Sequence, residues 1–404
     1  MNKIIVFGAG RIGRSFIGQI FSRGGYEVIF IDINKNLIDL LNQHKAYKVI
    51  IKGQKDESIE IKKIRGVHFD DKKKVIDELC TTSIVTVSAG QAALPGIIRC
   101  IGESLLIRYK NHPGSALDII IAENIRDGAG YFRKELYRTL GENFPLDRVA
   151  GLIETSIGKM VPPMTEEDLN EDPLQIFAEP YNTLIVDKKG FKNPIPDLPW
   201  LAPKENMKAW VDRKSYIHNL GHATAAYTGF LKFPRRIYLF EILEDQEIMN
   251  AVRNTMIESA KILIRLYPAE FDFQELRIHI DDLLNRFGNR ALKDIVFRIG
   301  CDLMRKLGPG DRLVSPIHDA VCYGMAYDKI LFALICGFYF RAKDEAGNYY
   351  PTDEKFFNNF TPDIEKLLIN ICKFDPENDK QIILKAKEYC KIINKIYKPE
   401  IVIN

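Results

Sequence analysis

A glycine-rich segment that directly follows an apolar run near the start of the chain restricts the fold more than any other feature. The segment KIIVFGAGRIGRSFIGQIF begins with a short apolar run and continues as Gly8-x-Gly10-x-x-Gly13. From Ile12 onward, the apolar residues recur with the period of a helix. A strand, a glycine turn and a helix in this order predict the first unit of a dinucleotide-binding sheet, in which the helix N-terminus receives a pyrophosphate.

Each glycine has its own role in such a turn. Gly8 makes the tight bend, Gly10 lets the backbone approach the pyrophosphate, and Gly13 allows the helix to pack close to the strand. The second apolar run, EVIFID, ends in Asp32, 19 residues after Gly13. A carboxylate there accepts hydrogen bonds from ribose hydroxyls and repels a 2′-phosphate, so we expect NAD rather than NADP as the cofactor.

The remainder of the N-terminal half alternates between predicted strands and helices. SIVTVSAG (83–90) and DIIIAEN (118–124) are expected to be buried strands separated by a helix over 92–108. This alternation predicts an α/β fold with a doubly wound, Rossmann-type parallel sheet, whose ligands bind beyond the carboxyl ends of the strands. From position alone, Asn124 more often caps a turn than binds a ligand. The expected cofactor-binding residues are Gly8, Gly10, Arg11, Ile12, Gly13, Asp32, Ser88, Ala89, Gly90 and Asn124.

The chain of 404 residues is too long for one ordinary core, and its character changes along its length. Prolines concentrate between 161 and 204, where one further strand is predicted at 182–187. Beyond that stretch the apolar period is mainly helical, with helices expected at 242–267, 281–297, 317–341 and 381–396. We therefore predict an NAD-binding domain over 1–200 and a mostly helical substrate-binding domain over 201–404.

Charge and cysteine usage narrow the class of protein. A formal net charge of +3 gives no reason to expect a nucleic-acid or membrane partner. The seven cysteines are scattered and form no C-x-x-C pair, which is typical of reduced thiols. No apolar stretch approaches the roughly 20 residues that span a bilayer, and the first predicted strand leaves no room for a signal peptide. We expect a cytoplasmic protein.

The segment KSYIHNLGHATAAY (214–227) gathers polar residues on a predicted helix. At about 100° per residue, Lys214, Asn219 and His222 fall within an arc of about 140°. His218 and His222 have the spacing of a zinc motif, but the glutamate that such a motif needs is replaced by Asn219, so we expect no metal. Periodicity alone leaves two interpretations open, an active site or a satisfied structural network.

These segments resemble the polyol-specific long-chain dehydrogenase family, also called the mannitol dehydrogenase family. The resemblance covers nearly the whole chain, from FGAGRIGRSFIG and IIAEN through VDRKSYIHNLGHATAAYTG to RKLGPGDRL, and is greatest to the bacterial enzymes that act on mannitol 1-phosphate. The spacing Lys-x4-Asn-x2-His is the signature of the family. The resemblance implies a metal-independent mechanism with Lys214 as general base, Asn124 and Asn219 as an oxyanion hole, and His222 orienting a substrate hydroxyl.

The resemblance also implies a substrate site. Arg298 and Lys306 correspond to positions that contact substrate oxygens in the family. The chain departs from the pattern at Gly158 and Lys159, where the family usually has Asp-Arg, and at Cys301, where close relatives have arginine. Together, Arg298, Lys306 and Lys159 still provide enough positive charge to hold a phosphate.

We therefore expect a monomeric enzyme that oxidises a small molecule, mannitol 1-phosphate, reversibly to fructose 6-phosphate with NAD. The alternatives within the family are an unphosphorylated polyol dehydrogenase and a hexuronate reductase. The alternative outside it is a non-catalytic, NAD-binding redox sensor.

Overall fold

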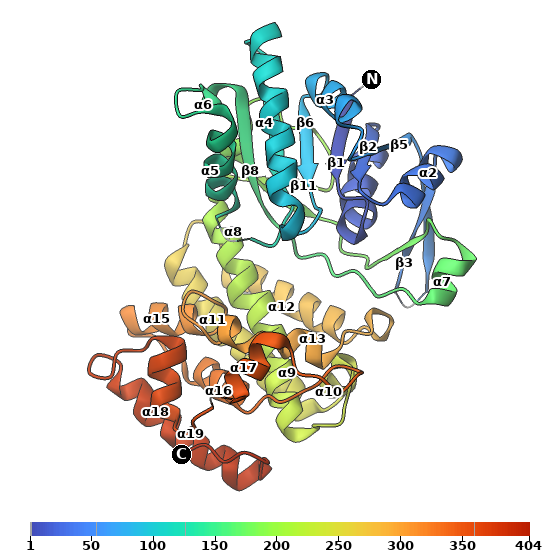
Figure 1. Ribbon diagram of the computed structural model, residues 1–404. Coiled ribbons are helices and arrows are strands. Elements are labelled where there is room, and N and C mark those ends of the chain that lie inside the picture. The colour runs from blue at the N-terminus through green and yellow to red at the C-terminus, as the bar shows by residue number, and fades with distance from the viewer. Residues whose placement is uncertain (1, 54, 126, 359) are drawn as a thin grey trace. The chain divides into compact units, whose positions relative to one another are not determined.

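The computed structural model describes residues 2–53, 55–125, 127–358 and 360–404 (Figure 1). The chain forms two compact units, Met1–Trp210 and Val211–Asn404, and each is described by itself. The division between them lies inside helix α8 (Met207–Arg213), whereas the sequence analysis drew the boundary between 200 and 201.

The first unit is built on an eight-stranded sheet with the strand order β11-β10-β8-β7-β6-β1-β2-β5. All pairs from β8 to β5 are parallel, and β10 runs antiparallel to β8. This arrangement confirms the predicted Rossmann-type sheet. The strands are β1 (Lys3–Phe7), β2 (Glu27–Asp32), β5 (Ile64–His68), β6 (Ile84–Val87), β7 (Leu117–Ile121), β8 (Ala150–Ser156), β10 (Leu184–Asp187) and β11 (Leu201–Lys204).

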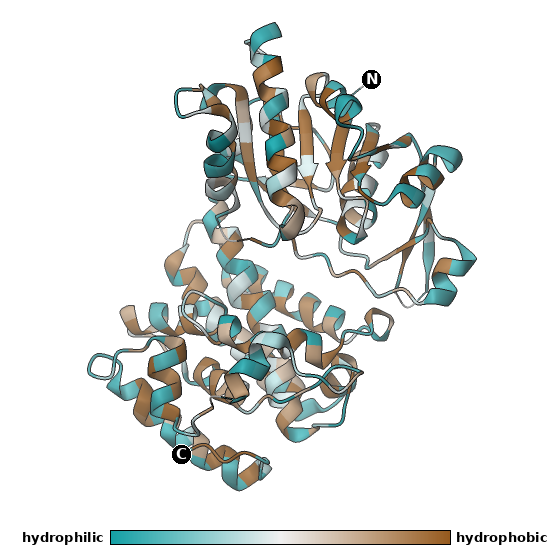
Figure 2. Ribbon diagram, viewed as in Figure 1, coloured by the Kyte–Doolittle hydropathy of each residue, from teal (hydrophilic) through white to brown (hydrophobic). Residues whose placement is uncertain are grey.

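Both faces of this sheet are covered by helices, because successive residues of the strands point to opposite sides. Ile4 and Val6 belong to one apolar core, which includes residues of η1 (Gly13–Gly18), α1 (Gln19–Arg23) and α2 (Lys35–His44). Ile5 and Phe7 belong to the other, with α3 (Lys72–Cys80), α4 (Leu94–Asn111), α5 (Gly128–Leu140) and α6 (Leu146–Val149). Figure 2 shows the resulting contrast between mainly apolar strands and helices that are apolar along one side.

A small second sheet was not predicted. It has the order β4-β3-β9, with β4 (Glu57–Ile61), β3 (Tyr47–Ile51) and β9 (Ile176–Ala178). Its edge strand β4 is mostly exposed and carries two glutamates, so its apolar pattern is weak. The remaining short helices of this unit are η2 (Gln91–Ala93), α7 (Glu166–Glu171) and η3 (Lys188–Gly190).

The second unit is helical, as predicted, and is organised around α9 (Leu220–Lys232). This helix is buried along most of its length, and its glycine and alanine residues let α10, α11, α13 and α16 pack closely against it. The other helices are η4 (Lys214–Asn219), α10 (Leu239–Leu243), α11 (Gln246–Leu266), α12 (Phe273–Phe287), η5 (Arg290–Leu292), α13 (Val296–Gly300), α14 (Leu303–Lys306), α15 (Val314–Cys322), α16 (Asp328–Phe338), α17 (Pro351–Asn358), α18 (Ile364–Leu367), η6 (Leu368–Cys372) and α19 (Lys380–Tyr397). Among the described residues, none of the helices has the length and apolarity needed to cross a bilayer.

Two of the four long helices predicted here are wrong. The helix expected over 281–297 is broken because α12 ends at Phe287, is capped by Gly288, and is followed by a left-handed residue at Lys293. The helix expected over 317–341 is divided at Gly324, which has a φ of +63°. The helices expected over 242–267 and 381–396 are confirmed as α11 and α19, with slightly different ends.

Candidate active site

The glycine turn of the first unit has the conformation that a pyrophosphate site needs. Gly8 follows β1 with a φ of +93°, which L-residues with side chains rarely adopt. A side chain on Gly13 would overlap the carbonyl oxygen of Gly8, so the helix can approach the turn only with glycine there. At Gly10, in contrast, no heavy atom lies within 4 Å of the place a Cβ would take. The turn therefore leaves open space on the side where a ligand would approach.

Asp32 holds its carboxylate beside this turn. It ends β2, and its Oδ2 accepts a hydrogen bond of 2.7 Å from the N–H of Ala9, while Oδ1 accepts one of 2.8 Å from the N–H of Asn34. Both bonds fix the carboxylate next to the glycine loop, as in a ribose-binding acid. Of the two other residues assigned to this turn, Arg11 is exposed and Ile12 is half-buried.

The carboxyl end of β6 lies next to that of β1 in the sheet, and the carboxyl end of β7 lies next to that of β6. Ser88 donates its N–H to the carbonyl of Phe7 at 2.8 Å, and Gly90, with a φ of +85°, donates its N–H to Oε1 of Glu123 at 2.7 Å. Burial raises the pKa of Glu123, an effect opposed by the N–H groups of Gly90 and Ala89. The sheet order thus brings Gly8, Asp32, the loop 88–90 and Asn124 to one edge, where the sequence analysis expected the cofactor.

Lys159, expected at the substrate, lies in the first unit as part of a buried polar network. Its ammonium donates hydrogen bonds to the carbonyls of Glu179 at 2.7 Å and Tyr181 at 2.5 Å. These bonds join the segment after β8 to the segment after β9. Contact between Lys159 and substrate stays a prediction.

In the second unit, the Lys214 segment is a π-helical turn rather than a regular α-helix. The N–H of Leu220 bonds to the carbonyl of Ser215, five residues earlier. The predicted spacing of 100° per residue is therefore wrong for this turn, because i→i+5 bonding places residues five apart nearly above one another. Lys214 and Asn219 are five apart, so they lie closer together around the helix than the predicted 140°. π-helical turns are frequent at functional sites.

Lys214 has the properties of a proton acceptor near neutral pH. Burial, together with the nearby charge of Arg312, lowers the pKa of Lys214 from 10.5 to about 8. Part of the side chain remains exposed. A lysine with such a pKa exchanges a proton with a substrate far more readily at pH 7–8 than an ordinary surface lysine.

His222, eight residues after Lys214, is held between aromatic rings. Its ring stacks on Phe287 with a centroid distance of 3.8 Å and an interplanar angle of 24°. The ring of His218 meets it edge to face, with a centroid distance of 4.9 Å. Burial, followed by the charges of Arg298 and Arg312, lowers the pKa of His222 well below 6.5, so the ring is neutral at pH 7. Among the described residues, no group of three or more His, Cys, Asp or Glu side chains could hold a metal ion.

Several cations surround the histidine. Arg298 is paired with Asp294. The Lys306 ammonium donates to the carbonyl of Ile299 at 2.7 Å, and burial, together with the charge of Arg312, lowers the pKa of Lys306 to about 8. Arg298 and Lys306, two of the three predicted substrate cations, act electrostatically on His222, and so does Arg312.

Comparison with known proteins identifies the family of the chain. The family model of the mannitol dehydrogenase Rossmann domain matches residues 2–200, and that of the mannitol dehydrogenase C-terminal domain matches residues 206–389. The chain belongs to the mannitol dehydrogenase family. It is accordingly an NAD-dependent oxidoreductase that acts on CH–OH groups.

Among solved structures, the chain is similar to mannitol 2-dehydrogenase from Pseudomonas fluorescens in a ternary complex with NAD and D-mannitol. The TM-score is 0.70 at 15% identity, covering 96% of this chain and 91% of the other. Weaker matches include D-mandelate dehydrogenase (TM-score 0.46, 14% identity, 83% and 96% covered) and ketopantoate reductase from Staphylococcus aureus (0.43, 10%, 82% and 96%). At these identities, the likeness to mannitol 2-dehydrogenase concerns the fold.

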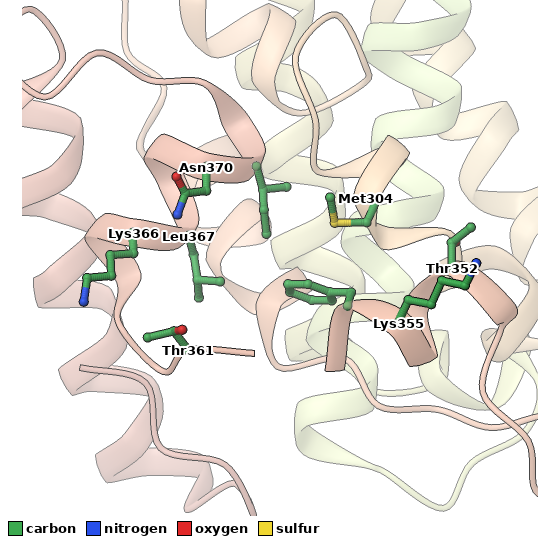
Figure 3. Close-up of a pocket in the computed structure, with 9 residues that line it drawn as sticks. Met304, Thr352, Lys355, Thr361, Lys366, Leu367 and Asn370 are labelled. Carbon is green, nitrogen blue, oxygen red and sulfur yellow. The ribbon is translucent and has the colours of Figure 1, made fainter. Parts of the chain in front are cut away.

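A separate cavity in the second unit has a volume of about 450 Å³ (Figure 3). Its lining comes from α14, α17, α18, η6 and the segment before α18, and contains Met304, Thr352, Lys355, Phe356, Thr361, Lys366, Leu367, Asn370 and Ile371. Lys214, Asn219 and His222 are not among these residues, so the cavity is distinct from the candidate active site.

Proposed function

We propose that the protein catalyses the reversible oxidation of a sugar alcohol phosphate, mannitol 1-phosphate, to fructose 6-phosphate with NAD and without a metal ion. The observation that carries this proposal is the pKa of about 8 at Lys214, on a helix that also bears Asn219 and His222 and is surrounded by arginine and lysine side chains. These groups supply a base, hydrogen-bond donors and positive charge for one polar substrate.

The first unit fits the cofactor. The open space at Gly10 and the hydrogen-bonded carboxylate of Asp32 suit a pyrophosphate and a ribose, respectively. The bound nicotinamide would accept the hydride from the secondary alcohol carbon. Binding by the remaining expected residues, Arg11, Ile12 and the loop 88–90, belongs to the same proposal.

The side chains of this chain handle the proton. In the oxidation direction, Lys214 takes the proton of the substrate hydroxyl while the hydride leaves the carbon that bears this hydroxyl. The amides of Asn219 and Asn124 donate hydrogen bonds to the oxygen, where negative charge develops. His222 binds a neighbouring hydroxyl. Loss of one such amide donor would cost roughly 2.7–4 kcal/mol of transition-state stabilisation.

The cations around His222 support a phosphorylated substrate. Arg298 has most of its side chain exposed, at 66%, and therefore can reach a ligand. Its planar guanidinium can bind a phosphate through two hydrogen bonds, a stronger contact than one to a neutral hydroxyl. Lys306 and Arg312 add positive charge nearby.

A second candidate is an unphosphorylated hexitol. The observation that favours it is the pairing of Arg298 with Asp294, because a carboxylate beside the guanidinium repels a phosphate dianion. The related Pseudomonas enzyme was solved with D-mannitol, which also supports this candidate.

Oxidation of NADH with fructose 6-phosphate, fructose and a hexuronate, measured in parallel, decides between the candidates. We expect kcat/KM for fructose 6-phosphate to exceed that for fructose at least about tenfold, or about 1.4 kcal/mol. Arg298→Ala should remove most of this preference. Arg253→Ala, which breaks the pair of Arg253 with Asp281 elsewhere in the helical unit, is the matched control and should retain it. Equal efficiency on the two ketoses would exclude the phosphate assignment.

We also propose that the protein is a monomer and is located in the cytoplasm. All seven cysteines are free thiols, and five of them are buried, as expected for a protein of a reducing compartment.

A further inference from the structure

Asp294 is a buried carboxylate that has no part in the reaction proposed above. It lies between η5 and α13 and is 7% exposed. Its Oδ1 accepts a hydrogen bond from the guanidinium of Arg298, and its main-chain carbonyl accepts one of 2.8 Å from the N–H of Leu239. Both its backbone and one of its carboxylate oxygens are therefore held in place.

The second carboxylate oxygen faces the histidine of the catalytic helix. Oδ2 of Asp294 lies 3.6 Å from Nε2 of His222, and within the described parts of the chain both atoms are buried without a hydrogen-bond partner. A separation of 3.6 Å is too long for a hydrogen bond, and two buried polar atoms without partners are costly. A small rotation of the ring would bring the pair to about 2.9 Å and satisfy both atoms.

The chemistry of the two groups decides where the histidine carries its proton. A carboxylate only accepts hydrogen bonds, and a neutral imidazole has one N–H. Arg298, Arg312, Arg286, Lys306 and His218 face His222 from the surrounding elements, and with burial they keep the ring neutral. With the proton on Nε2, the ring donates toward Asp294. With the proton on Nδ1, two lone pairs would face each other.

The other ring nitrogen is then free to accept a hydrogen bond. Because Nε2 is buried, the 12% of the His222 side chain that is exposed belongs to its other atoms, which include Nδ1. The stacking on Phe287 holds the plane of the ring.

We infer that Asp294 is a positioning residue, which keeps the proton of His222 on Nε2 and anchors Arg298, so that Nδ1 accepts a hydrogen bond from a substrate hydroxyl. This inference rests on the proposed function, in which His222 binds a hydroxyl. It also restricts the substrate, because an acceptor nitrogen selects a hydroxyl at that carbon and rejects a carbonyl or carboxylate oxygen.

The tautomer of His222 can be measured without any substrate, which separates this test from the test of the reaction. Two-dimensional ¹⁵N–¹H NMR of histidine-labelled protein, with His222→Gln to assign the signal, should show the proton on Nε2 in the wild type. Asp294→Asn can turn its NH₂ group toward the ring and should move the proton to Nδ1. Asp281→Asn, which alters an exposed carboxylate paired with Arg253 in the same unit, should leave the signal unchanged.

Kinetics provide the second arm. Asp294→Asn should lower kcat/KM at least tenfold, because a ring protonated on Nδ1 would point its N–H donor at the substrate hydroxyl, which also donates. The affinity for NADH, measured by fluorescence titration, should be unchanged. Adding His222→Gln to Asp294→Asn should cause little further loss, since both changes remove the same interaction. Asp294→Glu retains a carboxylate, so it should preserve the Nε2 tautomer and part of the activity.

A wild-type ring protonated on Nδ1 would overturn the inference whatever the activity. The same conclusion would follow if Asp294→Asn folded and retained both the tautomer and the rate. Should Asp294→Asn not fold, the wild-type spectrum and Asp294→Glu decide. Loss of the Nε2 tautomer in Asp294→Glu would then contradict the assignment.

Discussion

At the scale of single residues, the proposed role of Lys214 as general base makes its charge state decide which direction of the reaction is favoured. Only the neutral amine can take the hydroxyl proton, so the rate of alcohol oxidation should rise with pH and level off above the pKa of about 8. The rate of ketone reduction depends on the ammonium form and should fall over the same pH range.

Lys214→Ala should lower kcat by orders of magnitude with NADH binding intact. A pH-independent oxidation rate between pH 6.5 and 9.5 would contradict this role.

The same lysine should reduce the stability of the fold. Its pKa is about 8 in the folded protein and 10.5 as an ordinary lysine, so the unfolded chain binds more protons between these values. The free energy of unfolding therefore rises with pH between about 8 and 10.5. Below pH 8 the destabilisation caused by burying the charged lysine is fully present. Lys214→Met should remove up to about 3 kcal/mol of it at pH 7, at the cost of turnover. Thermal unfolding at pH 7 and pH 9.5 should show a clearly smaller advantage of the variant at the higher pH.

The sequence was most informative where spacing itself carries meaning. Lys214, Asn219 and His222 were identified from one short segment, because the interval between them is a family signature. Asp294 was not identified, since a single acidic residue before a short helix has no distinctive pattern. Its significance depends on its contact with His222, which is distant in the sequence, together with its pairing to Arg298. The only local signal was its position four residues before Arg298, where a helical ion pair is expected.

At the scale of elements, the glycine turn offers a pair of matched substitutions. Gly13→Ala places a methyl group onto the carbonyl oxygen of Gly8 and should destabilise the fold itself, lowering the melting temperature. Gly10→Ala meets no protein atom, so it should leave the melting temperature nearly unchanged while weakening NADH binding. Unfolding curves and NADH fluorescence titrations of both variants check the contrast. If the two variants were equally stable and bound NADH with equal affinity, this result would argue against a pyrophosphate at Gly10.

Element boundaries were less predictable than element types. The strands β1 and β2 were located correctly because each short apolar run ends at a turn or a charged residue. The helix expected over 281–297 failed because its apolar period continues through Gly288, and the break is made by backbone turns that periodicity does not report. The π-helical turn was missed for the same reason, since its side chains also suit an α-helix.

At the scale of the whole molecule, activity should be independent of metal. No metal-holding group of His, Cys, Asp or Glu was found among the described residues, and the lysine base needs no Lewis acid partner. Prolonged dialysis against a chelator should leave kcat and KM unchanged, measured with NADH and the preferred ketose. A loss of activity that zinc restores would contradict the assignments of His218 and His222.

The π-helical turn also makes the length of the chain a determinant of activity. A turn with i→i+5 bonds holds one residue more than an α-helical turn, so deleting one residue between Lys214 and Asn219 would let an α-helix form in its place. The wide turn accommodates its extra residue locally, so the segments on either side would keep nearly the same orientation when that residue is removed. A single-residue deletion in this turn should therefore leave the direction of the proposed base relative to His222 nearly unchanged, whereas the same deletion between Asn219 and His222, where the helix is regular, should rotate it by about 100° and abolish activity.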